Sequence, residues 1–125
     1  MLFDTDMFIW VQRGNSKATA LIEKTVEHYI SVASYMELIQ GAKNKQQHTL
    51  TKDFIIQFEF IILPLSANIG HRASVYMEEY ALSHGISSMD AIIAATATEN
   101  NLTLSSSNAK HFWPIKELKL KVFKS

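Results

Sequence analysis

Four oxygen-bearing residues, Asp4, Glu37, Asp90 and Asn108, each lie in an apolar or small-residue context beside a signal for the start of a helix. If the fold brings these side chains together, the carboxylates repel one another at neutral pH and require a divalent cation to neutralise them. The leading hypothesis from the residues alone is therefore a metal-dependent hydrolase.

Each of these residues also has a purely structural interpretation. Ser34 and Glu37, like Ser87 and Asp90, match the Ser-x-x-acid capping box, in which the acid reaches back to the first amide of a helix. Polar residues that could cap a helix on their own are Asn108, Asp4 and Asp6. The metal hypothesis is favoured because all the candidates are expected at helix N-termini along one edge, where the helix dipole keeps carboxylates ionised.

The elements that must position these residues follow from hydrophobic periodicity, which predicts short strands alternating with helices. Strands are expected at 1–3, 29–33, 60–63, 102–104 and 118–123. Helices are expected around 7–11 and 50–58, and over 17–27, 34–41, 66–84, 89–100 and 108–113. This alternation predicts right-handed crossovers and a mostly parallel sheet of four to five strands with helices on both faces, a three-layer α/β domain over residues 1–125.

A sheet of this kind binds its ligand outside the carboxyl ends of the strands, where loops and helix N-termini converge. Asp4, Glu37 and Asn108 each follow a predicted strand. The topology therefore predicts that these residues lie at the same end of the sheet.

Composition limits the other possibilities. The formal net charge is zero, so any site for a polyanion must be local rather than a property of the whole molecule. There is no Cys, which excludes a disulfide framework, a thiolate metal site and a cysteine nucleophile. No apolar run approaches the roughly 18 residues of a membrane span, and Asp4 interrupts any signal-like N-terminus, so we expect a cytoplasmic protein without membrane contact.

Basic and aromatic residues near the C-terminus have two interpretations each. Lysines gather there at Lys110, Lys116, Lys119, Lys121 and Lys124. The alternation of lysine with apolar residues at 119–122 predicts an edge strand whose lysines prevent the association of one sheet with another. The alternative is that the lysines form a rim that contacts phosphate. Trp10, Phe112 and Trp113 could stack on unpaired bases, and His111 could contact phosphate. The simpler expectation is a core or dimer-interface position for the aromatic residues and a surface or capping position for the histidine.

Four short segments, taken together, resemble the PIN-domain ribonucleases, in particular the toxin subunits of bacterial VapBC-type toxin–antitoxin pairs. The segments are LFDTD at 2–6 followed by Ile9, SVASYMEL at 31–38 followed by Gly41, DAIIAATA at 90–97, and LSSSNAKHF at 104–112. Each is weak alone, but all four occur in the family's order over a chain of the family's length.

The resemblance implies a site and a reaction. Asp4, Glu37 and Asp90 match the family's acidic metal-binding positions, and Asn108 lies where many relatives have a fourth acid. Two auxiliary positions are Ser106, where the family commonly has Thr, and Asp6, which could join the outer shell of the metal or cap a helix. The implied activity is a ribonuclease that uses Mg²⁺ or Mn²⁺ and water as nucleophile, and leaves 5′-phosphate and 3′-hydroxyl ends.

Partners also follow from the resemblance. Such toxins usually form homodimers and bind an antitoxin whose C-terminal segment covers the acidic groove. We expect the helices before Gly41 and around 50–58 to form that groove.

Two alternatives remain. One is a catalytically inactive PIN-fold module with a binding or regulatory role. The other is a phosphatase of the haloacid-dehalogenase type, suggested by Asp4-Thr5-Asp6, although that class needs a later acidic pair and a catalytic lysine, and this chain has only two further Asp residues, Asp53 and Asp90.

Overall fold

The computed structural model describes all residues from Met1 to Ser125. In chain order, its elements are β1 (Leu2–Phe3), α1 (Thr5–Gln12), α2 (Ser16–Lys24), β2 (Tyr29–Ser31), α3 (Val32–Gly41), α4 (Lys45–Gln57), β3 (Ile61–Leu63), α5 (Ala67–His84), α6 (Ser88–Glu99), β4 (Leu104–Ser106), α7 (Ala109–Phe112) and β5 (Leu120–Val122). The alternation predicted from the periodicity is confirmed.

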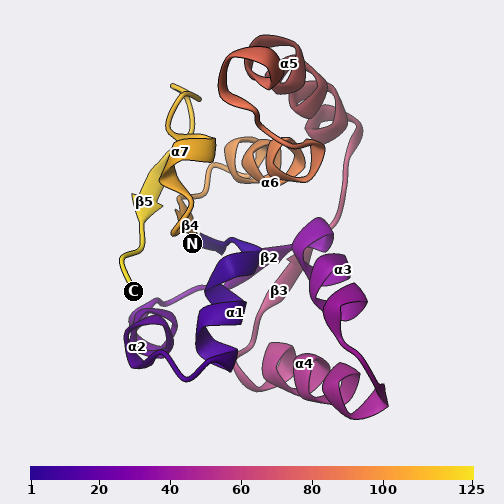
Figure 1. Ribbon diagram of the computed structural model, residues 1–125, viewed down its shortest axis with the longest axis vertical. Coiled ribbons are helices and arrows are strands. Elements are labelled where there is room, and N and C mark those ends of the chain that lie inside the picture. Colours follow the sequence, from indigo (N-terminus) through magenta and orange to yellow (C-terminus); the bar gives the residue numbers. More distant parts are fainter.

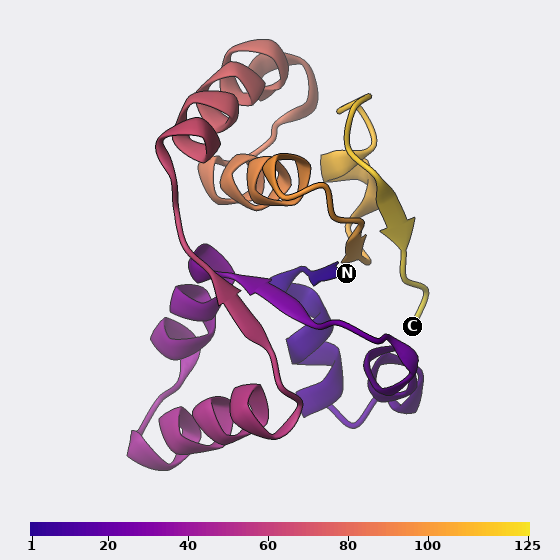
Figure 2. The same ribbon diagram turned by 180° about the vertical axis from the view of Figure 1, so that it is seen from behind.

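The five strands form one sheet in the order β3-β2-β1-β4-β5, and every neighbouring pair is parallel. The central strand β1 pairs with β2 on one side and β4 on the other, with Leu2 opposite Leu104 and Phe3 opposite Ser105. Helices α5 and α6 lie on one side of the sheet, and α1, α2 and α4 lie on the other (Figures 1 and 2). The predicted three-layer α/β architecture is therefore confirmed, with a fully parallel sheet.

Two hydrophobic cores fill the spaces between the layers. Because side chains alternate across a strand, Leu2 packs with α5 and α6, whereas its neighbour Phe3 packs with α1, α2 and α4. Both side chains are fully buried. The short central strand thus ties the two cores together and holds the residue that follows it, Asp4, in a fixed position.

The start of α3 differs from the sequence prediction. Ser31, not Ser34, caps this helix, because the Ser31 hydroxyl accepts a hydrogen bond from the Ser34 backbone N–H at 3.0 Å. Strand β2 therefore ends earlier than expected, and Glu37 lies in the second turn of α3 rather than in a capping box. The prediction that all the candidate acids occupy helix N-termini is wrong for Glu37.

The other predicted helix and strand limits shift by small amounts. Strand β4 is Leu104–Ser106 rather than 102–104, which brings Ser106 into the sheet as a fully buried residue. Helix α5 ends as predicted at Gly85, whose φ of 65° is the left-handed conformation that glycine adopts most easily. Strand β5 is an edge strand with Lys121 exposed, in agreement with the edge-strand interpretation of the C-terminal lysines.

One histidine, His28, joins two loops near the N-terminal ends of β2 and β3. The His28 ring nitrogens Nδ1 and Nε2 lie 2.6 Å from the carbonyl oxygens of Phe58 and Thr25 respectively. The ring also packs against Phe60, with centroids 5.2 Å apart. His28 therefore fixes the connection that leads into β3.

None of the helices has both the length and the apolar character that crossing a lipid bilayer requires.

Candidate active site

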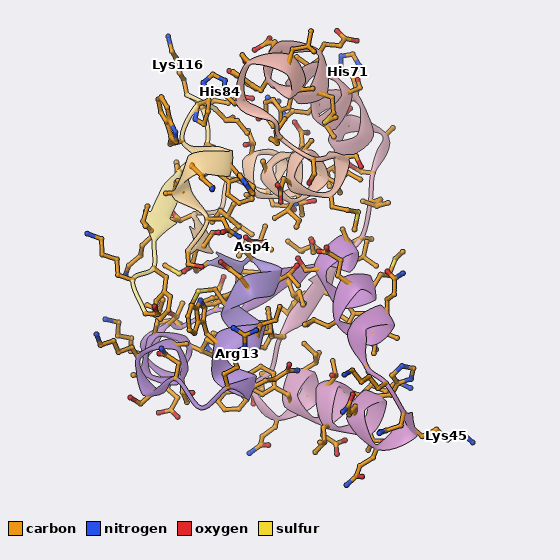
Figure 3. The ribbon with its side chains drawn as sticks, viewed as in Figure 1. Asp4, Arg13, Lys45, His71, His84 and Lys116 are labelled. Atoms are coloured by element: carbon orange, nitrogen blue, oxygen red, sulfur yellow. The ribbon has the colours of Figure 1, made fainter.

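Asp4 is the most buried acid of the chain, at 3% exposure, and it lies where β1 ends and α1 begins. Its Oδ1 accepts the backbone N–H of Thr5 at 2.8 Å, so Asp4 is the N-cap of α1, as one of the structural interpretations proposed. Its Oδ2 accepts the hydroxyl of Ser106 at 2.7 Å. Both oxygens are therefore held in place from two different elements of the fold. Figure 3 shows Asp4 near the middle of the molecule, between the two groups of helices.

The environment of Asp4 disfavours its charged form. Burial, together with the smaller effect of the nearby charges of Asp6 and Asp90, raises the pKa of the Asp4 carboxyl to about 7. The hydrogen bonds from Ser106 and from the Thr5 amide act in the opposite direction. A cation beside Asp4 would relieve both the burial cost and the repulsion, because it would stabilise the carboxylate against its two acidic neighbours.

Asp6 lies beside this acid on the first turn of α1. Its Oδ2 accepts hydrogen bonds from the backbone N–H of Ser107 at 2.9 Å and from the Ser107 hydroxyl. Its Oδ1 is buried and has no hydrogen-bond partner. A buried carboxylate oxygen without a partner is costly, so this atom is available to a cation or a water molecule.

Glu37 reaches the site from α3 through Thr5. The Thr5 hydroxyl donates to Glu37 Oε1 at 2.7 Å and lies 2.9 Å from the Ser34 hydroxyl. Since the Thr5 amide binds Asp4, one residue joins both acids, and it does so from the start of α1. Ser34 is fully buried and also contacts Ser31 at 3.2 Å, so a chain of hydroxyl groups holds Glu37 in one orientation.

Asp90 enters from the first turn of α6, capped by Ser87, whose hydroxyl accepts the Asp90 N–H at 3.1 Å. This confirms the N-cap predicted at Ser87. The side chain of Asp90 is 20% exposed, and its Oδ2 lies 3.2 Å from Nδ1 of His111 on α7. His111 therefore contacts a candidate catalytic acid, and its side chain is still 36% exposed, as expected for a surface histidine.

Asn108 occupies the N-cap position of α7, but its side chain makes no capping hydrogen bond and the residue is exposed. Its backbone N–H donates to the Ser106 hydroxyl at 3.0 Å, and that hydroxyl binds Asp4. The structure therefore connects Asn108 to the acids through its backbone and Ser106. No contact joins its amide side chain to the carboxylates.

The acids differ in how closely they come together. Asp6 and Asp90 lie near enough to Asp4 to raise its pKa, whereas Glu37 is joined to Asp4 through Thr5. No three acidic or histidine side chains of the chain lie close enough together to hold one metal ion among them. The donor set still fits a hard divalent cation, because Mg²⁺ and Mn²⁺ bind through one or two carboxylate oxygens and complete their shell with water. The unpartnered Asp6 oxygen supports this fit.

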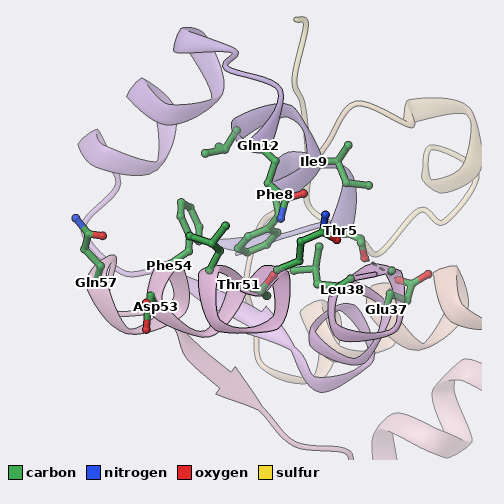
Figure 4. A pocket seen from close by; sticks show the side chains of 15 residues that line it. Thr5, Phe8, Ile9, Gln12, Glu37, Leu38, Thr51, Asp53, Phe54 and Gln57 are labelled. Atoms are coloured by element: carbon green, nitrogen blue, oxygen red, sulfur yellow. Dashed lines mark hydrogen bonds between the residues drawn. The ribbon is translucent and has the colours of Figure 1, made fainter. Parts of the chain in front are cut away.

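A groove of about 800 Å³ begins at Thr5 and Glu37 and runs between α1, α3 and α4. Figure 4 shows Phe8 and Phe54 inside it and Gln57 towards the far end. Its walls are largely apolar and include Leu50, which is 62% exposed. The groove predicted between the helix before Gly41 and the helix around 50–58 is present, and Thr5 and Glu37 connect one end of it to the acidic site.

Three contacts to the candidate acids were not predicted from the sequence, although His111 itself was considered there as a residue that could contact phosphate. Thr5 joins Asp4 to Glu37, Ser107 holds Asp6, and His111 contacts Asp90. Thr5 and Ser107 are common small polar residues, and their roles depend on partners that are distant in the chain. The only signal was that each of the three adjoins a candidate residue or lies within a few positions of one.

Comparison with known proteins identifies the family to which the chain is similar. The PIN domain family matches residues 1–112 of the chain. No curated protein sequence matches closely enough to count as a relative.

Solved structures with the same fold include several toxin–antitoxin complexes. The chain is 30% identical to a chain of a toxin–antitoxin complex from Klebsiella pneumoniae, covering 94% of this chain and 93% of that one, with a TM-score of 0.79. It is 23% identical to a chain of VapBC2 from Rickettsia felis bound to a DNA fragment from the promoter, with 98% of both chains covered and a TM-score of 0.82. It is 21% identical to a chain of VapBC-1 from nontypeable Haemophilus influenzae, covering 97% and 96%, with a TM-score of 0.82.

Proposed function

The chain belongs to the PIN domain family, and from this premise we propose that it is a metal-dependent endoribonuclease, the toxin of a VapBC-type toxin–antitoxin pair. The observation that carries the proposal is the buried Asp4 carboxylate, which is surrounded by further acids and has no cationic side chain hydrogen-bonded to it. An arrangement of this kind is stable as a set of carboxylates only with a bound cation.

Asp4 and Asp90 would hold Mg²⁺ or Mn²⁺, with Asp6 as the auxiliary ligand. When bound, the cation supplies Lewis acidity, lowers the pKa of water and offsets charge on the phosphate. Glu37 has one oxygen fixed by Thr5, so its other oxygen can accept a hydrogen bond from the attacking water and orient it towards the phosphorus. Ser106 keeps Asp4 in its rotamer.

The nearby histidine also has a role in this proposal. His111 contacts Asp90 Oδ2 and therefore restrains the side chain of that acid. With a proton on Nδ1, the imidazole donates a hydrogen bond to this carboxylate oxygen, which as an ionised group can only accept one. Asn108, at the exposed end of the same turn, would contact water or phosphate as a neutral group.

Cleavage of total cellular RNA by the purified protein tests this proposal. We expect cuts only when Mg²⁺ or Mn²⁺ is present, with 5′-phosphate and 3′-hydroxyl ends, because water is the nucleophile. The Asp4→Asn variant should cut at a rate at least about a hundredfold lower, since it loses an acidic ligand, whereas Asp53→Asn removes an exposed carboxylate and should cut normally. Cyclic-phosphate ends or cleavage in chelator would refute the mechanism, and absence of any cleavage would favour the inactive binding module.

The groove supports a second element of the proposal, an antitoxin partner. A largely apolar groove that ends at carboxylates suits an amphipathic segment whose apolar side chains lie between α1, α3 and α4 and whose basic residue reaches Glu37. Such a segment would block the acidic site directly. We further propose that two copies of the chain pair as a homodimer, as is usual for these toxins.

Substitution on the groove surface tests the antitoxin contact. Leu50→Glu places a charge in the groove at an exposed position and should weaken binding of the antitoxin encoded beside the gene by tenfold or more, roughly the effect of losing one anchor residue. Leu82→Glu is the matched control, because Leu82 is fully exposed on α5 and does not line the groove. Equal affinity of both variants and the wild type would remove the groove from the proposal.

A further inference from the structure

Trp113 is exposed although the residues around it in the chain are buried. Its exposure is 64%, whereas Phe112 is fully buried and Ile115 is 3% exposed, with Pro114 buried between them. The backbone N–H of Trp113 donates a hydrogen bond to the Ala109 carbonyl at 2.8 Å and so closes the turn of α7. The backbone on both sides is thus anchored in the core, and the indole is held outward at a fixed position.

A second aromatic ring supports the indole from α5. The rings of Trp113 and His84 meet nearly at right angles, with centroids 5.7 Å apart and an interplanar angle of 89°. Tyr80 meets His84 in the same edge-on manner at 6.0 Å, one turn earlier on the helix. An edge-on contact covers at most one face of the indole, and the 64% exposure of Trp113 shows that much of the ring remains open to solvent. The open face of Trp113 is therefore a flat, ordered and solvent-exposed surface.

The indole is connected to the acidic site through α7, which ends at Phe112 directly before Trp113. Trp113 follows His111 by two positions, and Nδ1 of His111 lies 3.2 Å from Asp90. Helices α6 and α7 both pack into the same core, which contains Phe112 and the alanines of α6. The indole thus extends from the C-terminal end of the helix whose His111 contacts Asp90.

The charges beside the indole favour an anionic chain. Lys110 and Lys116 are exposed and lie three positions before and after Trp113. The next acid in the chain, Glu117, is bound to Arg72 at 2.5 Å and accepts the Tyr76 hydroxyl. The neighbourhood of the indole therefore carries local positive charge in a molecule with zero net charge, as a site that binds a phosphate backbone requires.

We propose that Trp113, supported by His84, is a stacking platform for an unpaired base of single-stranded RNA, connected to the acidic site through α7. Every base has a π-face that can stack on an indole, so the platform selects for unpaired bases rather than for one sequence. A duplex is excluded because its bases already stack on one another. That this base belongs to the nuclease substrate rests on the proposed function, whereas stacking itself does not.

Tryptophan fluorescence tests the stacking, because the chain has only two tryptophans. In an Asp4→Asn background, which keeps RNA intact, the Trp10→Phe variant reports Trp113 and the Trp113→Phe variant reports Trp10. Titration with a single-stranded oligoadenylate should quench the emission of the first variant strongly and that of the second weakly. A blunt duplex of the same length should quench neither. Equal quenching of both variants, or no response of Trp113 to the single strand, overturns the proposal.

Cleavage kinetics and oligomeric state complete the test. Trp113→Ala should raise the KM for an unstructured RNA by about tenfold, the effect of losing one stacked base, with the loss falling on KM rather than kcat. Trp113→Phe should recover most of the affinity. An unchanged KM, or a change in sedimentation from dimer to monomer without an effect on RNA, would assign the indole to a protein interface and overturn the proposal. If the wild type cleaves no RNA, the nuclease proposal fails while the fluorescence titration still decides the stacking.

Discussion

The Asp4→Asn substitution should stabilise the metal-free protein at neutral and alkaline pH. Burial and the charges of Asp6 and Asp90 raise the pKa of Asp4 from 3.8 to about 7, so the folded state binds the proton of this carboxyl more tightly than the unfolded state does. The contribution of Asp4 to stability is therefore greatest in acid, decreases as pH rises from about 4, and is constant above about 7. The asparagine is neutral at every pH and does not carry this penalty.

The magnitude follows from the pKa difference. A pKa raised from 3.8 to about 7 corresponds to roughly 4 kcal/mol of lost stability once Asp4 is fully ionised. Relaxation of the site and water entry reduce this value, so we expect the free energy of unfolding of Asp4→Asn to exceed that of the wild type by about 2 to 4 kcal/mol at pH 8. The Asn side chain can still accept the Thr5 amide, and the Ser106 hydroxyl can rotate to accept from the new amide group.

Urea unfolding in chelator, at a series of pH values between 4 and 8, measures the effect. The quantity of interest is the difference between wild type and Asp4→Asn, because titration of all other groups cancels in it to first order. We expect this difference to be close to zero at the lowest pH and to grow until about pH 7. Asp53→Asn is the control and should follow the wild type throughout, since Asp53 is exposed.

A flat difference across the pH range would refute the reasoning, because it would mean that Asp4 is not desolvated or repelled as the structure indicates. Lower stability of Asp4→Asn at pH 8 would refute it as well. Addition of Mg²⁺ or Mn²⁺ should offset most or all of this difference, since an ion that binds only the folded wild type stabilises it by about 2.7 kcal/mol at a hundredfold excess over its Kd.

Three further predictions concern single contacts. Thr5→Val removes the hydroxyl that holds Glu37 and should lower kcat about tenfold with little change in KM, whereas Thr5→Ser should retain activity. A kcat for Thr5→Val equal to that of the wild type would show that Glu37 needs no such support. His28→Ala leaves two carbonyl groups without their ring partners and should lower the free energy of unfolding by about 1 to 3 kcal/mol in urea titrations, and no loss would show that water replaces the ring. Gly85→Ala places a Cβ at a φ of 65° and should cost about 1 to 2 kcal/mol, with Gly85→Asn costing less, and the ranking is read from thermal unfolding midpoints.

The architecture was predictable because hydrophobic periodicity carries most of the information about a parallel sheet. The strands are short apolar runs separated by helices of sufficient length for crossovers, and the order of the elements allows few topologies. The positions of Asp4, after the first strand, and of Asp90, three residues after a capping serine, followed directly from this pattern.

The sequence prediction placed the start of α3 too late, at Ser34, because Ser31 and Ser34 are equivalent candidates for the N-cap. Val32 and Ala33, which separate them, suit a strand as well as a helix, so local propensity does not choose between Ser31 and Ser34. The choice is made by tertiary packing, which buries Ser34 beside Thr5. This shift also moves Glu37 from the expected capping box to the second turn of α3, where the Thr5 hydroxyl donates to its carboxylate.

Strand β4 was placed too early for a related reason. Ser105 and Ser106 are small polar residues that indicate a loop when considered locally, yet both are fully buried. Ser106 is tolerated there because its hydroxyl donates a hydrogen bond to Asp4 and accepts one from the backbone N–H of Asn108. Such pairings between residues distant in the chain, like that of His111 with Asp90, cannot be found from a single sequence.

The central claim is that the acids around Asp4 bind a divalent cation. Electron paramagnetic resonance of Mn²⁺ added to the purified protein measures this directly, because bound Mn²⁺ loses the sharp signal of the free ion. We expect the wild type and Asp53→Asn to bind Mn²⁺, Mg²⁺ to compete for the same site, and Asp4→Asn to leave the ion free. Binding by Asp4→Asn as tight as that of the wild type, or no binding by the wild type, would contradict the claim.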